Sequence, residues 1–174
     1  MKKQVLSTAM AMTMGLFATM PATAAESVIS WTGIVPGTIN GPDFGLAAPG
    51  GGEIQQGTII ADETGTFTSG QVEVRAYALL TDGNGDIDPA TEYDGAIDWS
   101  VSTRDINLEE YDESLLKVTL NNQEVTDGEV VATLAGNPNL AIAVSYSDPV
   151  VGVMPGERVQ ASVRLFAEAP AGVI

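Results

Sequence analysis

The side chains best suited to chemistry in this sequence belong to one acidic loop, residues 82–94. Asp82, Asn84, Asp86 and Asp88 alternate along this loop. Ca²⁺ prefers oxygen ligands, and alternate side chains of a curled loop can converge on one ion. The spacing therefore predicts a calcium site formed by these four residues.

The loop departs from the EF-hand pattern at two positions. Ile87 stands in the place of the Gly that turns an EF-hand loop, and Tyr93 stands in the place of its bidentate Glu. The alternative interpretation is a long hairpin loop between a strand that ends at Leu80 and one that begins at Ala96, in which Gly and Asp are turn formers. Only the first interpretation requires an ion.

The chain lacks the side chains that most enzymes use for catalysis. The chain has no His and no Cys, so it lacks the commonest general base, the best nucleophile and all imidazole or thiolate metal ligands. It also lacks the nucleophile-elbow, phosphate-loop and dinucleotide motifs. Its 23 acidic residues offer so many carboxylate pairs that no glycosidase-like pair stands out. We expect a protein that is not an enzyme and has no cofactor, unless the acidic loop holds Ca²⁺.

The charge is strongly negative, with 23 acidic and 7 basic residues and a formal net charge of −16 at pH 7. Such a surface repels phosphate backbones and anionic lipid headgroups, so we expect no nucleic-acid partner and no electrostatic attachment to a membrane. Solubility outside the cell is the simpler explanation of the charge, and cation binding is the other.

Residues 1–25 have the three parts of a secretory signal: two lysines, an apolar run through Phe17, and the small residues 22–25. We expect cleavage after Ala24 or Ala25. A transmembrane helix is a weaker interpretation, because polar residues interrupt the apolar run and a span needs about 20 apolar residues. No later segment is long and apolar enough for a span, so we expect an exported chain without direct membrane insertion.

Period-two alternation of apolar and polar residues dominates the rest of the chain, and no segment of ten or more residues keeps helical spacing. Half-buried strands are expected at 71–80, 96–102, 140–146 and 158–166, with shorter strands at 53–60, 115–120 and 130–134. Short strands at roughly ten-residue spacing favour an all-β fold, an immunoglobulin-like β-sandwich. A closed barrel is the alternative.

Three connections carry their own predictions. Asn121 and Asn122 suit a two-residue hairpin turn, because Asn tolerates positive φ. Residues 40–52 are rich in Gly and Pro, which predicts a linker without regular structure. The acidic stretch 105–113 fits either a solvated crossover between sheets or one helical turn.

The segment 26–37 follows the predicted signal and also alternates. Ile29, Trp31, Gly33 and Val35 fall on one face of the predicted strand. A strand in this place, followed by a Pro/Gly break, can pair within its own sheet or leave its domain and pair with another.

The whole chain resembles a major subunit of a chaperone–usher fimbria, of the type without Cys. The resemblance rests on the signal, the alternating N-terminal segment with Gly33, the acidic all-β body and a last strand at 158–166. The chain differs from many such subunits in lacking a disulfide and in continuing past Phe166 to Ile174.

The resemblance implies a sandwich, residues 38–174, that lacks its final strand and leaves an apolar groove open. A periplasmic chaperone would fill this groove first, and the donor strand 26–37 of the next subunit would then replace it. Gly33 would sit where the groove is shallow, with Ile29, Trp31 and Val35 in flanking pockets. These four residues are called the donor-strand set. An outer-membrane usher is the further expected partner.

We therefore expect a structural subunit of a surface fimbria, exported through the periplasm, that polymerises with identical or related subunits and supports adhesion or biofilm formation. A shaft subunit is expected, because the sequence has the length of one domain. The alternative is a monomeric secreted or periplasmic β-sandwich binding module, calcium-dependent if the acidic loop holds an ion. In that case the first strand would pair with its own sheet.

Overall fold

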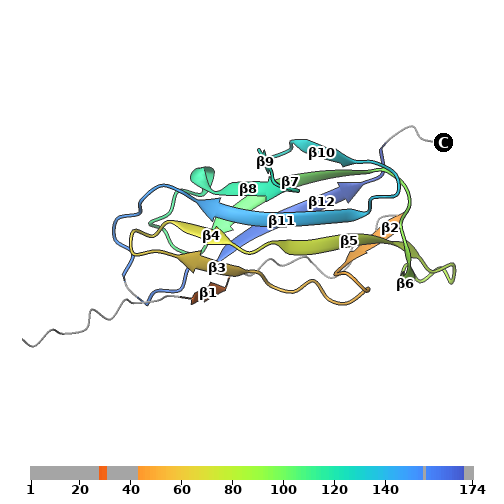
Figure 1. Ribbon diagram of the computed structural model, residues 1–174, viewed down its shortest axis with the longest axis horizontal. Coiled ribbons are helices and arrows are strands. Elements are labelled where there is room, and N and C mark those ends of the chain that lie inside the picture. Colours follow the sequence, from red (N-terminus) through yellow and green to blue (C-terminus); the bar gives the residue numbers. More distant parts are fainter. Residues whose placement is uncertain (1–27, 31–42, 155, 171–174) are drawn as a thin grey trace, which may run out of the picture.

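The computed structural model describes residues 28–30, 43–154 and 156–170 (Figure 1). These residues form an all-β sandwich of two antiparallel sheets, as predicted. The two sheets are separate, so the closed-barrel alternative is wrong. Within this part of the chain the helical element is one 3₁₀ turn, η1 (Glu113–Leu115). None of the described helical structure is long and apolar enough to cross a membrane.

The larger sheet has nine strands. They are β1 (Val28–Ser30), β2 (Phe44–Ala47), β3 (Thr58–Ala61), β4 (Phe67–Ser69), β5 (Val72–Leu79), β6 (Ile87–Glu92), β8 (Lys117–Leu120), β9 (Gln123–Val125) and β11 (Asn139–Tyr146). Strand β11 pairs with β8 along one edge and with β5 and β4 along the other. Strands β2 and β6 pair with β5, β3 pairs with β4, β1 pairs with β3, and β9 pairs with β8.

The smaller sheet has three strands in the order β10 (Val130–Thr133), β7 (Ile97–Ile106) and β12 (Ala161–Glu168). Strand β7 is the longest of the described strands and lies between the other two. Both β10 and β12 are therefore edge strands of this sheet.

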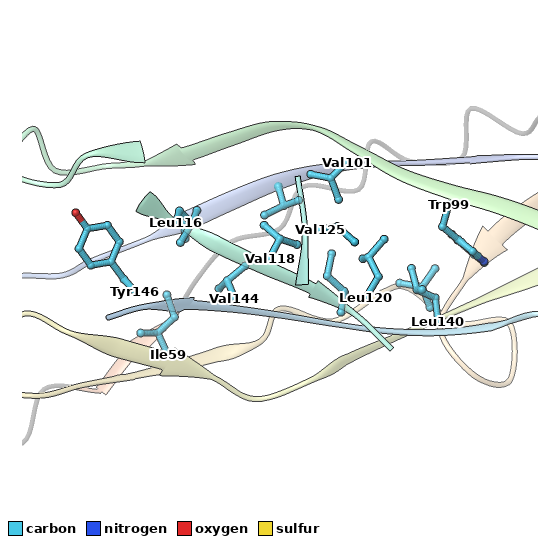
Figure 2. Packing of buried hydrophobic residues seen from close by; sticks show 14 of the residues in the cluster. Ile59, Trp99, Val101, Leu116, Val118, Leu120, Val125, Leu140, Val144 and Tyr146 are labelled. Atoms are coloured by element: carbon cyan, nitrogen blue, oxygen red, sulfur yellow. The ribbon is translucent and has the colours of Figure 1, made fainter. Parts of the chain in front are cut away.

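The core lies between the two sheets and is built from alternate residues of their strands. Figure 2 shows Trp99 and Val101 of β7 across the core from Leu140 and Val144 of β11. All four side chains are buried. The indole Nε1 of Trp99 donates to Oγ1 of Thr133 at 3.2 Å, so this buried donor is satisfied.

Arg104, near the end of β7, connects the two sheets by hydrogen bonds. Its Nη1 donates to the carbonyl oxygen of Leu116 at 2.8 Å, and its Nη2 donates to that of Val125 at 2.6 Å. Its Nε lies 2.8 Å from Oδ1 of Asp127, an ion pair without the alignment of a hydrogen bond. Because a guanidinium presents several donors in one plane, one side chain of β7 satisfies main-chain oxygens at β8 and β9.

The prediction of a linker without regular structure at residues 40–52 is wrong for the described part of this range. Strand β2 forms there and pairs with β5. The turn after β2 is held by Tyr77, whose hydroxyl accepts from the N–H groups of Gly50 at 2.6 Å and Gly51 at 3.1 Å and lies 3.2 Å from the carbonyl oxygen of Ala48, to which it donates. Both glycines have positive φ, 87° and 78°. Tyr77 is far away in sequence, so composition alone could not reveal this partner.

The other connections follow the predictions more closely. Asn121 and Asn122 have φ of 50° and 65° and form the turn between β8 and β9, which confirms the predicted hairpin. Strand β7 continues to Ile106, and the chain then crosses to the larger sheet. The crossover interpretation of the acidic stretch 105–113 is therefore correct, with η1 starting only at its last residue.

Candidate functional site

The free edge of β12 is the first part of the candidate site. All eight residues of β12 pair with β7, and among the described residues β12 has no other strand partner. An edge strand presents unpaired N–H and C=O groups along one side, ready to pair with another extended chain. The last strand of the sandwich therefore offers a main-chain template.

The core is less well covered along the second half of β12. The pairing register shifts between Arg164 and Leu165. Before the shift the inward side chains of Ala161 and Val163 are 1% and 7% exposed. After it, Leu165 and Ala167 are only partly buried, although they pack against the core cluster.

The partners of these two residues on β7 are fully enclosed. Val101, opposite Leu165, and Trp99, opposite Ala167, are each 0% exposed. Residues directly opposite in an antiparallel pair project from the same face of the sheet. Leu165 and Ala167 therefore project towards the core from the edge strand, beside partners on the central strand that are enclosed.

The N-terminal strand is the second part of the candidate site. Strand β1 pairs antiparallel with β3 of the same chain, with Val28, Ile29 and Ser30 opposite Ile60, Ile59 and Thr58. Of the predicted donor-strand set, Ile29 lies within β1, whereas Trp31, Gly33 and Val35 lie outside the described residues. Pairing within the same sheet is what the alternative interpretation, a monomeric module, expects.

The first part of the acidic loop connects β5 to β6, and β6 itself lies within the rest of the loop. Oδ1 of Asp82 accepts from the N–H of Asn84 at 3.0 Å, and Nδ2 of Asn84 donates to Oδ2 of Asp82 at 3.0 Å. The main-chain oxygen of Asp86 accepts from the N–H of Leu80 at 2.7 Å. These bonds close the turn of a hairpin whose second strand is β6, a strand that the sequence interpretation missed.

Asp88, the fourth predicted calcium ligand, lies on β6 and bonds locally. Its Oδ2 accepts from Oγ1 of Thr91 at 2.7 Å and its Oδ1 from the N–H of Ala90 at 3.0 Å. These bonds, that of Thr91 first, hold the pKa of the Asp88 carboxyl below its usual value. In the described part of the chain, no three His, Cys, Asp or Glu side chains gather into a group that could hold a metal ion. Calcium binding by Asp82, Asn84, Asp86 and Asp88 stays a prediction.

Comparisons with protein-family models, with curated proteins and with solved structures found no match to this chain. Its candidate function therefore rests on its own residues and geometry.

The sequence interpretation did not identify the edge of β12 as a site from its residues. Alternation at 158–166 predicted a strand there, but it carries no information about which neighbours that strand has. The available signal was Phe166, an aromatic residue on the polar side of the alternation. It is 43% exposed on the outer face of β12, opposite Ser100.

Proposed function

We propose that this chain is a structural subunit of a surface fimbria that polymerises by donor-strand exchange. The observation that carries the proposal is the free edge of β12, beside which Leu165 and Ala167 of the core remain partly exposed. An added strand at this edge would pair with the exposed main chain and cover these side chains. In this proposal the sandwich is immunoglobulin-like and lacks its final strand.

The donor in this proposal is the N-terminal segment 26–37 of another subunit. Its apolar face, Ile29, Trp31, Gly33 and Val35, would lie against the core, with Gly33 where the space is smallest. Burial contributes roughly 25 cal/mol per Å² of apolar surface, main-chain pairing adds affinity, and the pockets for alternate side chains set the register. Because each subunit would offer one donor and one acceptor, repetition of the contact yields an open filament.

The assembly route follows from the same surface. An unpaired edge next to exposed core residues promotes aggregation. A periplasmic chaperone would therefore cover the edge until an outer-membrane usher brings in the next subunit. The finished fibre, at the cell surface, would support adhesion or biofilm formation, and the chain would have no catalytic role.

Matched substitutions on the two faces of the donor segment test the proposal. Trp31→Asp places a charge on the apolar face, and Thr32→Asp places the same charge on the opposite face. We expect Trp31→Asp to abolish fibres seen by electron microscopy of the secreted protein, and Thr32→Asp to retain them. An intact protein that is a stable, soluble monomer when produced without any chaperone would contradict the proposal.

A second candidate function, a monomeric binding module, is favoured by one observation, the pairing of β1 with β3 in the same chain. Its calcium-dependent form is tested by calorimetry of chelator-treated protein with Ca²⁺. Heat that is present for the native protein and lost in Asp82→Asn/Asp86→Asn would support this form. The absence of heat at millimolar Ca²⁺ would exclude it.

A further inference from the structure

We infer that β1 is an intramolecular inhibitor of assembly, a cis strand that must leave β3 before the N-terminal segment can pair with another molecule. This inference rests on the proposed function, because it concerns what the donor segment does before it is donated. The observation behind it is the antiparallel pairing of Val28, Ile29 and Ser30 with β3.

The cis and trans states exclude each other. Strand β1 lies inside the proposed donor segment 26–37, and Ile29 belongs to the face that would enter a neighbouring sandwich. In the cis state the backbone of Ile29 is already aligned with that of Ile59. One residue cannot occupy both positions, so every donation event requires the β1–β3 pairing to open.

The cis contact also covers an edge. Strand β3 has β4 on its other side, so it becomes an edge strand of the larger sheet when β1 leaves. Within β3, Ile59 is 0% exposed and Ile60 is 70% exposed. Removal of β1 would therefore leave an unpaired main chain beside an exposed Ile, which is a surface that favours aggregation.

The extent of pairing makes this strand releasable. Strand β1 pairs over three residues, whereas β12 pairs with β7 over eight. Covalent linkage nevertheless gives the cis segment an effective concentration of the order of millimolar. Pairing of the donor segment with the edge of β12 in another subunit can extend over more residues than the β1–β3 pairing, so it should prevail at equilibrium. The β1–β3 pairing would slow assembly at low subunit concentration.

Because the native chain has no Cys, a disulfide across the two strands tests this inference cleanly. Directly opposite residues in an antiparallel pair have Cα atoms about 4.5 to 5.5 Å apart, within disulfide range. Val28→Cys/Ile60→Cys joins one such pair at an exposed position of β3. Val28→Cys/Leu134→Cys, which uses an exposed residue after β10, is the mismatched control.

In the purified secreted protein under mild oxidation, we expect the matched pair to form an intramolecular crosslink at least tenfold faster than the control. Non-reducing electrophoresis and mass spectrometry measure this directly. Equal rates for the two variants would overturn the cis pairing, whatever the protein does in assembly.

Assembly of the same matched variant, followed by light scattering and electron microscopy, supplies the second readout. We expect the oxidised form not to assemble and the reduced form to assemble like the native chain. Oxidised protein that assembles as fast as reduced protein would overturn the inference and leave the proposed function standing. The crosslink could also form in protein that assembles in neither the oxidised nor the reduced form. That result would overturn both the proposed function and the inhibitory role, and it would still show that β1 pairs in cis.

Discussion

Leu165 lies directly opposite Val101 in the β12–β7 ladder, yet Val101 is fully buried and Leu165 keeps part of its side chain in water. Both residues belong to the face that packs on the larger sheet. Strand β7 is the central strand of its sheet and β12 is at the edge, and the difference appears after the register shift at Arg164 and Leu165. The pair therefore compares the central strand of the smaller sheet with its edge strand.

This relationship predicts unequal costs for the same kind of truncation in the isolated subunit. Val101→Ala should lower the free energy of unfolding by about 2 kcal/mol, because it leaves a cavity in a closed core. Leu165→Ala removes more carbon atoms but should cost less, since solvent already reaches this side chain. Urea denaturation of the monomer measures both. A larger loss for Leu165→Ala would mean that the edge strand β12 is as well covered as the central strand β7.

Arg104→Met should destabilise the fold by about 3 kcal/mol. The substitution keeps much of the aliphatic volume but leaves the carbonyl oxygens of Leu116 and Val125 without their donor. Arg104→Lys should recover only part of the loss, because a single ammonium cannot reproduce the planar set of donors. Thermal or urea unfolding provides the measurement.

Arg164→Met is the matched control for this experiment. Arg164 is exposed on β12, so its replacement should change the free energy of unfolding by no more than about 0.5 kcal/mol. Equal effects of the two substitutions would show that the bonds between Arg104 and the larger sheet add nothing beyond a general change in charge.

Asp62 should make stability depend on pH in the acid range. Hydrogen bonds from the hydroxyl of Thr66, and then from Thr64, lower the pKa of the Asp62 carboxyl from 3.8 to about 2. Because the folded pKa is the lower one, this stabilisation is present above about pH 4 and is lost as the pH falls towards 2. Asp62→Asn should therefore flatten the decline of thermal stability between pH 4 and pH 2.

Glu63→Gln, at the neighbouring position, serves as the control for Asp62→Asn, because the side chain of Glu63 takes no part in these hydrogen bonds. The profile of this variant should keep the slope of the native protein. If Asp62→Asn also kept that slope, the hydrogen bonds to Thr64 and Thr66 would not stabilise the charged carboxyl.

Tyr111 should act at the alkaline end of the pH range. Its hydroxyl donates to the carbonyl oxygen of Gly65 at 2.8 Å, and burial is the main cause that raises its pKa from 10 to about 12. A raised folded pKa means that stability is complete below pH 10 and is lost as the pH approaches 12. Tyr111→Phe should cost about 1 kcal/mol at pH 7 and lessen this alkaline loss. Denaturation at pH 7, 10 and 11.5 measures both effects, and an unchanged alkaline slope would contradict the assignment.

The local alternation of apolar and polar residues predicted strand β11 correctly. Residues 140–146 alternate strictly, and β11 forms there with Leu140, Ile142, Val144 and Tyr146 buried. Period-two alternation is sufficient for this prediction, because successive strand residues project from opposite faces.

Other elements depended on residues that are distant in the sequence. Strand β2 forms in a stretch rich in Gly and Pro, where pairing with β5 and the hydroxyl of Tyr77 order the chain. Arg104 lies two positions before the buried Ile106, on the same face of β7, and beyond the predicted strand 96–102. Its guanidinium donates to the main-chain oxygens of Leu116, just before β8, and of Val125 in β9. Contacts of this kind have no local signature.

For this protein, the sequence by itself determined the side-chain chemistry and the strand periodicity: no His or Cys, a large excess of carboxylates, and alternation along most of the chain. Only the tertiary structure decided which strands become neighbours. It placed β12 at an edge and paired β1 with β3. The physical reason is that alternation assigns each side chain to a face, whereas strand order depends on main-chain pairing between segments far apart in the chain.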